Sequence, residues 1–349
     1  MRIAVISPPW APVPPKLYGG IELVVDRLSV GFQAAGHDVL LYATGDSTSP
    51  VPTQWVLEHS EGQRIGMAVP EQRHVMHAYE AVREWGADVV HDHSIIGPFH
   101  AADRYPDLPV ATTIHGPFNE ELTDLYERLN KSKTPIIAIS HAQANSAPSV
   151  QVGRVIHHGV DASDFPVGDG AGGYCLFLGR MSPDKGPHRA IEAAEAAGVP
   201  LLMAAKMREA WEHHYFEEFV KPHLNDRIQY LGEVPHEHKL ELLAGATALL
   251  NPIRWNEPFG LVMIEALACG TPVLAFPEGA APEIVHDGVT GFLCDDTAAM
   301  AAAIANAKDL DRAACRGAVE TYFSTSRMEN EHLVLFREMV GLAPGAEAR

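Results

Sequence analysis

The sequence predicts an α/β protein of two lobes, each built on a doubly wound parallel sheet. Its 349 residues are about twice the length of a typical domain, which has roughly 150 residues. Short apolar runs alternate with segments of helical periodicity, and this alternation is typical of parallel strands joined by crossover helices. The alternation stops near the middle of the chain and then resumes, which indicates two sheets instead of one.

The first lobe is predicted over residues 1–160. Its clearest helix covers residues 21–35, where an apolar stripe runs from Leu23 to Phe32 and Gly36 follows as a typical helix end. Such a stripe packs against a sheet. Five strands are expected in this lobe, at residues 2–7, 38–43, 87–91, 109–114 and 135–139.

Residues 161–173 are predicted to be a linker, because they contain Pro166 and four glycines and show no periodicity. Three of the glycines, Gly168, Gly170 and Gly173, match the G-x-G-x-x-G pattern of dinucleotide sites. That pattern works directly after a strand, at the start of a helix, whereas here it precedes a predicted strand. We therefore interpret the match as accidental.

The second lobe is predicted over residues 174–326, and a closing helix and polar tail over residues 327–349. The helix is indicated by apolar residues such as Leu333 and Phe336 at helical spacing. Five strands are expected in this lobe, at residues 174–178, 200–204, 227–231, 247–251 and 271–275.

Composition argues against several partners. The chain has 26 Lys and Arg against 45 Asp and Glu, and the resulting net charge of −19 opposes binding to nucleic acid and to anionic membranes. The four cysteines lack the paired spacing of zinc sites and redox dithiols. Pro8 and Pro9 interrupt the N-terminal apolar run, and no later run is long enough to span a bilayer, so we expect a cytoplasmic protein.

The strongest candidate site is the turn at residues 179–186, which follows the first strand of the second lobe. Open α/β sheets bind ligands beyond the carboxyl ends of their strands. The turn adds two cations, Arg180 and Lys185, and the positive end of a helix that begins near Pro187. This combination is typical of a diphosphate site, but two solvated surface cations would give the same pattern.

A second candidate site covers residues 251–270, where Glu257 and Glu265 are separated by seven residues. Pro258 suits the first position of a helix, so we expect Glu257 in the preceding loop and Glu265 about two turns along. A carboxylate accepts hydrogen bonds from a diol, so Glu265 is suited to a ribose and Glu257 to a hexose hydroxyl. Alternatively, Glu257 is a helix-start acid and Glu265 a solvated residue. Further backbone donors are expected at Phe259, Gly260 and Leu261.

The first lobe contains a glycine turn that is a third candidate. Tyr18, Gly19 and Gly20 open its first helix, and bare backbone at a helix start permits an anion to approach. Ordinary helix capping explains the same residues almost equally well.

Histidines at strand ends form the fourth candidate. His115 follows one predicted strand, and His91 and His93 follow another, where ligands of such sheets bind. His91 and His93 have the spacing of two ligands on one side of an extended chain. No third ligand has a recognisable spacing, so a metal is not expected.

Taken together, these motifs resemble those of the family 4 retaining glycosyltransferases. The likeness spans nearly the whole chain and rests on Gly19-Gly20, His115-Gly116, the Arg180 to Lys185 turn, and above all Glu257-Pro-Phe-Gly with Glu265. It implies the GT-B fold, an α/β architecture in which two Rossmann-like domains flank a cleft. The first domain then binds the acceptor and the second the nucleotide-sugar donor. The resemblance also implies retention of anomeric configuration, with no metal and no other cofactor.

The resemblance implies a role for each of these residues. Those matching Arg180 and Lys185 contact the diphosphate, the one matching Glu265 contacts the ribose, and the one matching Glu257 contacts the donor sugar. The residue matching His115 lies beside the sugar at the reacting face. The segment 232–235, which includes Val234, resembles the stretch whose backbone meets the base.

The predicted function is therefore transfer of a sugar from a UDP-, GDP- or dTDP-linked donor to a soluble hydroxyl acceptor. A lipid acceptor is not expected, since the first lobe shows no basic or aromatic amphipathic surface. Two alternatives stay open, a sugar-nucleotide epimerase of the same fold and a noncatalytic nucleotide-sugar binding protein. The chain is also similar to an actinobacterial member from antibiotic-oligosaccharide assembly of the avilamycin type, although none of the quoted motifs carries that narrower resemblance. The oligomeric state is not predicted.

Overall fold

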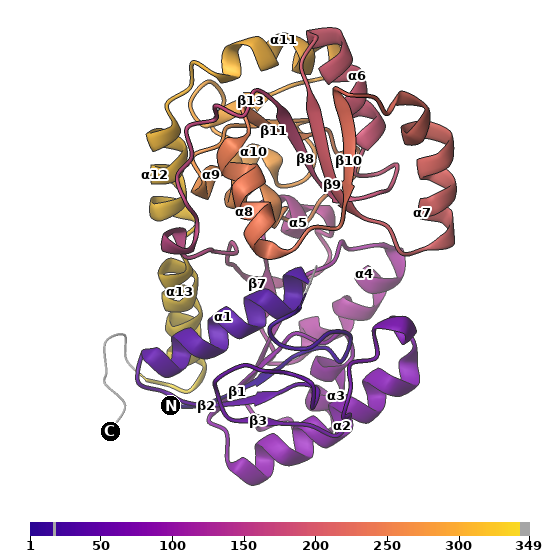
Figure 1. Ribbon diagram of the computed structural model, residues 1–349. Helices are drawn as coiled ribbons and strands as arrows, with labels where there is room; N and C mark the ends of the chain where they lie inside the picture. Colours follow the sequence, from indigo (N-terminus) through magenta and orange to yellow (C-terminus); the bar gives the residue numbers. More distant parts are fainter. Residues whose placement is uncertain (17–18, 343–349) are drawn as a thin grey trace. The chain divides into compact units, whose positions relative to one another are not determined.

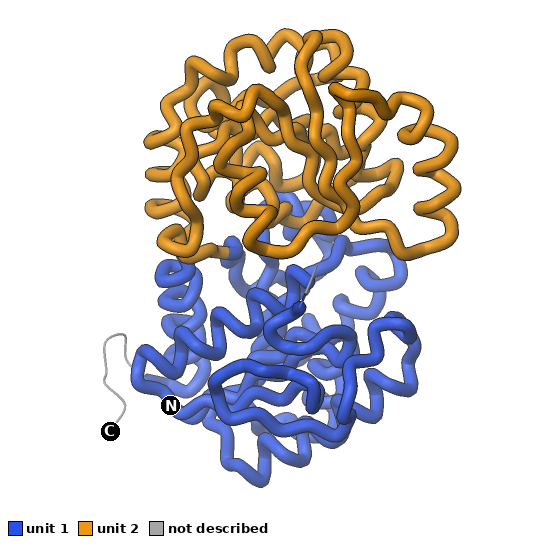
Figure 2. Tube along the Cα trace, viewed as in Figure 1, with its two compact units in different colours: residues 1–158, 325–349 blue, residues 159–324 orange. Residues whose placement is uncertain are grey.

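The computed structural model describes residues 1–16 and 19–342, and the chain divides into two compact units (Figure 2). Unit 1 comprises Met1–His158 together with Thr325–Arg349, and unit 2 comprises Gly159–Ser324. The closing helix thus belongs to unit 1, whereas the last residues of the predicted tail, 343–349, lie outside the described part of the chain.

The segment predicted as a linker, residues 161–173, is part of unit 2. The Gly168 amide donates to the Cys269 carbonyl at 3.0 Å, and the Gly170 amide donates to the Ala244 carbonyl at 3.3 Å. A Cβ atom on Gly168 would lie 1.9 Å from the same Ala244 oxygen, so close backbone packing accounts for this glycine. The break in periodicity therefore marks a loop packed on unit 2 and not a separate linker.

Unit 1 is built on a seven-stranded parallel sheet (Figure 1). The strand order is β3-β2-β1-β4-β5-β6-β7, so the chain runs outward from β1 in one direction and then from β4 in the other. This is the doubly wound arrangement that the sequence predicts. The strands are β1 (Arg2–Ile6), β2 (Asp38–Tyr42), β3 (Thr53–Gln54), β4 (Val89–Asp92), β5 (Val110–Thr113), β6 (Ile136–Ala138) and β7 (Val152–Val155).

The helices of unit 1 bury one face each. On α1, Leu28 and Phe32 are buried, and the Phe32 ring lies 5.5 Å from the ring of Phe336 on the last helix. This contact ties the end of the chain to the unit in which the chain begins. The helices are α1 (Gly20–Ala34), α2 (Ala68–Trp85), α3 (Gly97–Arg104), α4 (Glu120–Glu127), α5 (His141–Ser146) and α13 (Thr325–Met339), with 3₁₀ turns at Gly62–Arg64 and Arg128–Lys131.

Unit 2 repeats the plan with six parallel strands. Their order is β10-β9-β8-β11-β12-β13, again with a reversal of direction, here between β8 and β11. The strands are β8 (Cys175–Arg180), β9 (Leu201–Lys206), β10 (Ile228–Gly232), β11 (Ala248–Asn251), β12 (Val273–Ala275) and β13 (Gly291–Leu293).

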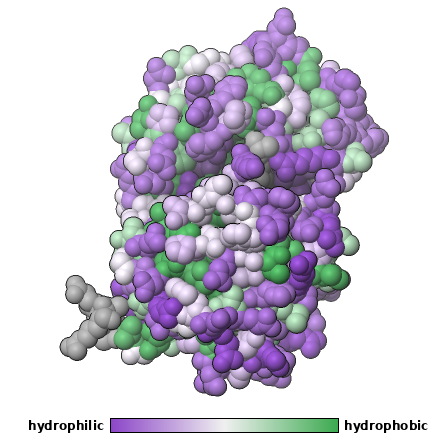
Figure 3. Space-filling model, turned by 60° about the horizontal axis from the view of Figure 1, so that its bottom comes forward, coloured by the Kyte–Doolittle hydropathy of each residue, from purple (hydrophilic) through white to green (hydrophobic). Residues whose placement is uncertain are grey.

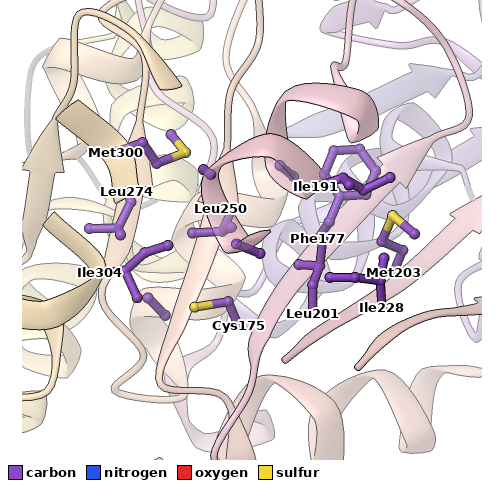
Figure 4. Packing of buried hydrophobic residues seen from close by; sticks show 14 of the residues in the cluster. Cys175, Phe177, Ile191, Leu201, Met203, Ile228, Leu250, Leu274, Met300 and Ile304 are labelled. Atoms are coloured by element: carbon purple, nitrogen blue, oxygen red, sulfur yellow. The ribbon is translucent and has the colours of Figure 1, made fainter. Parts of the chain in front are cut away.

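The core of unit 2 joins its sheet to helices α6 and α11 (Figure 4). Phe177 and Met203 come from the sheet, Ile191 comes from α6 and Ile304 from α11, and all four are buried. Burial of each such side chain is worth about 1.5–3 kcal/mol. The helices are α6 (Pro187–Ala197), α7 (Ala210–Tyr215), α8 (His236–Gly245), α9 (Leu261–Ala268), α10 (Ala281–Ile284), α11 (Thr297–Ala307) and α12 (Arg312–Tyr322), with short turns at Ala162–Asp164, Phe216–Val220 and Lys221–His223.

All ten predicted strands are present, and their ends lie within two residues of the predicted ones. The three strands that the prediction missed, β3, β7 and β13, all lie at sheet edges. An edge strand is covered on fewer sides, so it lacks the continuous apolar run that identifies a central strand. The exposed residues of β7 illustrate this point.

The surface drawn in Figure 3 is mostly hydrophilic, with hydrophobic residues in scattered small groups. Among the exposed apolar side chains are Ile65 and Val69, near the start of α2. No helix within the described part of the chain is both long and apolar enough to cross a membrane.

Candidate functional site

The strongest candidate residues lie where the strand order of unit 2 reverses. Arg180 is the last residue of β8, the loop after β8 carries Lys185, and the loop after β11 carries Glu257. These two strands are neighbours in a parallel sheet, so both loops leave from the same edge. Ligands of doubly wound sheets bind at this position.

Lys185 and Glu257 meet across these two loops. The Lys185 Nζ atom contacts Glu257 Oε2 directly, and Trp255 Nε1 donates to the same oxygen at 2.7 Å. The ammonium group also lies 5.2 Å from the centroid of the Trp255 ring. Both donors meet at Oε2, and Oε1 has no hydrogen-bond partner among the described residues.

Arg180 points to a different set of carboxylates. Its Nη2 atom lies 3.3 Å from Asp184 Oδ2, and its Nε atom lies 3.6 Å from Oε1 of the buried Glu212 on α7. The guanidinium group also lies 5.5 Å from the ring centroid of Trp211. The Arg180 side chain is 38% exposed, so these contacts orient it without removing it from solvent.

Glu265 is buried on α9, with 4% of its surface exposed. The alternative interpretation as a solvated residue is therefore wrong. Lys239 on α8 donates from Nζ to Glu265 Oε1 at 2.8 Å, and this contact supplies the counter-charge that a buried carboxylate needs. The prediction missed Lys239, because it lies 26 residues away and only the packing of α8 beside α9 brings the two side chains together.

The helix that carries Glu265 begins later than predicted. It starts at Leu261 and not at Pro258, so Glu265 is its fifth residue and not two turns in. Gly260, the N-cap residue, has a φ of 97°, a left-handed conformation that prevents the helix from extending backward. Phe259 is buried and its ring centroid lies 6.1 Å from that of Phe323, which anchors the loop before the helix.

The segment predicted to meet a base joins β10 to α8. Val234 is partly buried there, Gly232 has a positive φ of 79°, and Pro235 is the N-cap residue of α8. Since α8 also carries Lys239, one short helix connects this segment to the carboxylate of Glu265.

The glycine turn of unit 1 is the start of α1, with Gly19 as its N-cap residue and Gly20 as its first residue. A Cβ atom on Gly19 would lie 2.6 Å from Pro15 Cβ and 3.1 Å from Glu22 Oε2. The buried Glu22 carboxylate suits the helix dipole but opposes a second anion. The end of β8 and the turn after it, which together carry two cations, are therefore better suited to a diphosphate. Tyr18 lies outside the described residues.

Five histidines meet in unit 1 close to the ends of β4 and β5. His93 Nδ1 lies 2.8 Å from His115 Nε2, and both rings have further histidine neighbours. The other three members of this histidine cluster are His91, whose ring centroid is 4.0 Å from that of His93, His158, at 5.2 Å from His115, and His332 of α13, at 4.8 Å from His91.

Desolvation keeps the histidine cluster uncharged near neutral pH. It lowers the pKa of His115 to about 3 and that of His332 to about 4, and it holds the pKa values of His91, His93 and His158 well below their ordinary range. Neighbouring histidines lower the pKa values of His91, His93, His115 and His158 further, and the Arg327 guanidinium does the same for His332. Across residues 1–16 and 19–342, no group of three or more His, Cys, Asp or Glu residues is arranged to hold a metal ion.

Two protein-family models match the chain, one in each half. The model described as Glycosyltransferase Family 4 matches residues 18–164, and the model described as Glycosyl transferases group 1 matches residues 169–316. Together they cover most of unit 1 and most of unit 2.

Relatives and solved structures agree with these matches. A glycogen synthase of Mycobacterium tuberculosis is 27% identical, over 91% of this chain and 88% of its own length. The structure of AviGT4, a glycosyltransferase involved in avilamycin A biosynthesis, has a TM-score of 0.74 and 26% identity, and the match covers 98% of this chain and 99% of that one. A sucrose-phosphate synthase from Thermosynechococcus elongatus has a TM-score of 0.81 at 21% identity, with 98% and 99% covered. The chain therefore belongs to the family 4 glycosyltransferases and has their GT-B fold of two Rossmann-like domains.

Proposed function

We propose that this glycosyltransferase moves a sugar from a nucleoside-diphosphate sugar, linked to UDP, GDP or dTDP, to a hydroxyl group of a soluble acceptor. Transfer retains the anomeric configuration and uses neither a metal nor another cofactor. The observation that carries this proposal is the meeting of Lys185 and Glu257 beyond β8 and β11, with the buried Glu265 on the helix that follows.

The leaving diphosphate gains negative charge as the bond to the sugar breaks. In a chain of net charge −19 that charge needs local cations, and Arg180 at the end of β8 and Lys185 in the turn that follows are the two at this position. Both are already held by carboxylates, so they are oriented before a ligand arrives. A preorganised donor to developing charge is worth about 10² to 10³ in rate.

Glu257 is proposed to hold a hydroxyl of the donor sugar through Oε1. Its other oxygen, Oε2, accepts hydrogen bonds from Lys185 and Trp255. These contacts stabilise the negative charge of the carboxylate and make it a weaker nucleophile. The acceptor oxygen then forms its bond to the anomeric carbon on the face from which the phosphate oxygen departs. The leaving phosphate takes up the acceptor proton. A covalent sugar adduct on Glu257 would refute this mechanism.

Other residues of unit 2 are proposed to contact the rest of the nucleotide-sugar donor. Glu265 is proposed to accept hydrogen bonds from the ribose, and the backbone around Val234 to contact the base. The amides of Phe259, Gly260 and Leu261 lie at the start of α9, where a helix dipole favours phosphate. In unit 1, we assign to His115 a hydrogen bond to a sugar hydroxyl of the substrate, and to Gly19 and Gly20 a weaker contact with the donor.

The acceptor and the setting rest on the comparisons. AviGT4 is involved in avilamycin A biosynthesis, and its likeness at 26% identity supports our proposal of a role in antibiotic or other oligosaccharide biosynthesis. The four cysteines are free and buried, which favours the reducing conditions of the cytoplasm.

The donor is identified by a thermal-shift screen of UDP, GDP, ADP and dTDP. A ligand at 100 times its dissociation constant adds about 2.7 kcal/mol to the free energy of unfolding, so one nucleotide should raise Tm clearly above the others. Incubation of the matching nucleotide sugar with and without acceptor then separates the three functions. Transfer requires the acceptor, an epimerase gives an epimer from the donor alone, and a binding protein releases no nucleotide with any acceptor.

A further inference from the structure

We infer that His93 is a positioning residue that fixes the tautomer of His115, so that His115 presents an Nδ1–H group to an oxygen atom of the sugar substrate. The inference rests on the proposed contact between His115 and the substrate and deepens it. It names the atom that makes the contact and the residue that determines its proton.

The two histidines are held by neighbouring strands. His93 follows β4 and His115 follows β5, two strands that pair in parallel register. The His93 amide donates to the carbonyl of Ile6 at 2.9 Å, so its backbone is fixed to β1 as well. The two rings are nearly parallel, at 29°, with their centroids 5.1 Å apart, and His93 Nδ1 lies 2.8 Å from His115 Nε2. One of these nitrogens must donate to the other.

The surroundings of His93 decide which nitrogen donates. Its side chain is buried, and its Nε2 atom has no hydrogen-bond partner among the described residues. A proton on Nε2 would create a buried N–H group without an acceptor, and such groups are rarer in proteins than unpaired acceptors. Double protonation is opposed by desolvation, which holds the pKa of His93 well below its ordinary range. The proton of His93 therefore lies on Nδ1 and is donated to His115.

This hydrogen bond leaves a single arrangement for His115. Its Nε2 atom accepts from His93, and its pKa of about 3 leaves the ring with one proton near neutral pH. That proton lies on Nδ1. This atom has no hydrogen-bond partner among the described residues, and unlike Nε2 of His93 it is not fully buried. The ring is only partly buried and stacks on His158 at 5.2 Å, so its orientation is fixed while one edge stays accessible.

A histidine in this state donates a hydrogen bond and is a poor base. Nδ1–H suits a sugar hydroxyl or ring oxygen, which accepts hydrogen bonds, but it does not remove a proton from the acceptor hydroxyl. This agrees with a mechanism in which the leaving phosphate takes that proton. His115 then orients the substrate and is not the general base.

The test compares two substitutions of His93 with a control from the same cluster. His93→Asn keeps an N–H donor near the position of Nδ1, whereas His93→Phe keeps a ring and removes the donor. His332→Phe removes another buried histidine that does not hydrogen-bond to His115. We expect His93→Phe to lower kcat about tenfold with little change in donor KM. A tenfold loss corresponds to one lost hydrogen bond to a substrate. We expect His93→Asn to recover most of that loss, and His332→Phe to keep kcat.

Nitrogen-15 spectra of the histidine rings give a readout that does not depend on activity. Signals are assigned with His115→Ala, and the wild-type protein should show a protonated Nδ1 and an unprotonated Nε2 on His115. Protonation at Nε2 in the wild-type protein would overturn the inference, as would an unchanged kcat in a folded His93→Phe variant when His115→Ala is impaired. An unimpaired His115→Ala variant would instead refute the proposed contact of His115 with the substrate, while the spectra would still report its tautomer.

Discussion

Lys185 and Glu257 are 72 residues apart in sequence and are in direct contact, and the Glu257 oxygen that Lys185 contacts also accepts a hydrogen bond from Trp255. This contact joins the turn after β8 to the loop after β11, on either side of the point where the strand order of unit 2 reverses. The acid therefore orients the cation, and both donors meet at the same one of its two oxygens. A diphosphate that binds here has to share Lys185 with Glu257.

Lys185→Ala should lower kcat by about 10² to 10³ and leave the protein folded, since the ammonium group is proposed to stabilise charge that develops during the reaction. The measurement is steady-state turnover with the nucleotide sugar identified by the thermal-shift screen. Lys221→Ala is the matched control, because Lys221 also pairs with a glutamate, Glu217, but on the exposed surface of unit 2. Equal activities of the two variants would contradict the role of Lys185.

Trp255→Phe tests the hydrogen bond to Glu257 alone. The substitution keeps an aromatic ring near the Lys185 ammonium and removes the Nε1–H group that donates to Oε2 at 2.7 Å. A hydrogen bond to a charged group contributes about 1.5–3 kcal/mol, so kcat/KM should fall by roughly tenfold or more. If kcat/KM stays at the wild-type value, Trp255 does not orient Glu257.

Glu265→Gln should weaken binding of ribonucleotides more than that of 2′-deoxyribonucleotides. In its proposed role the carboxylate accepts from both hydroxyls of a ribose, and a 2′-deoxyribose lacks one of them. Isothermal titration with UDP and with 2′-deoxy-UDP, or with the corresponding pair for the preferred base, measures the difference. We expect the preference of the wild-type enzyme for the ribonucleotide to shrink about tenfold in the variant. The same preference in both proteins would exclude Glu265 from the ribose site.

Lys239→Met should destabilise unit 2 because it leaves the Glu265 carboxylate buried without its counter-charge. We expect a loss of about 1–3 kcal/mol in urea unfolding, below the usual cost for a buried pair because Lys239 is partly exposed. The double substitution Lys239→Met with Glu265→Gln should recover part of the loss. A double variant that is less stable than Lys239→Met would contradict this account.

Unfolding stability should fall as the pH decreases from about 6.5 to about 4. Burial lowers the pKa of His74 and of His332 to about 4, so below pH 6.5 the unfolded chain takes up protons that the folded chain does not. Each such histidine then costs up to about 1.4 kcal/mol per pH unit. Burial raises the pKa of Asp92 to about 6, which has the opposite sign and offsets part of the effect.

The free energy of unfolding at pH 7 and at pH 5 checks this prediction, with His332→Phe as the comparison. The variant removes one of the titrating groups and keeps a ring beside Phe336, so its stability should depend less steeply on pH. An identical pH dependence in the two proteins would show that His332 does not contribute.

The sequence determined the architecture because the pattern of burial is local. Central strands of a parallel sheet are covered on both faces and read as apolar runs, so the nine central strands were predictable, and with them the loops that carry Lys185 and Glu257. Of the four edge strands, only β10 was predicted. The edge strands β3, β7 and β13 were not predictable in this way. The start of α9 was placed three residues early, because Pro258 suits a helix start but the left-handed conformation of Gly260 follows it.

Only the tertiary structure decided which side chains meet. Lys239 pairs with Glu265 because α8 lies beside α9, and His332 reaches His91 because the last helix returns to the unit in which the chain began. Neither pair has a spacing in sequence that reveals it, since contacts between distant segments depend on how whole elements pack. The state of a buried group such as His93 depends on all of its neighbours at once, and for that reason it could be read only after the fold was known.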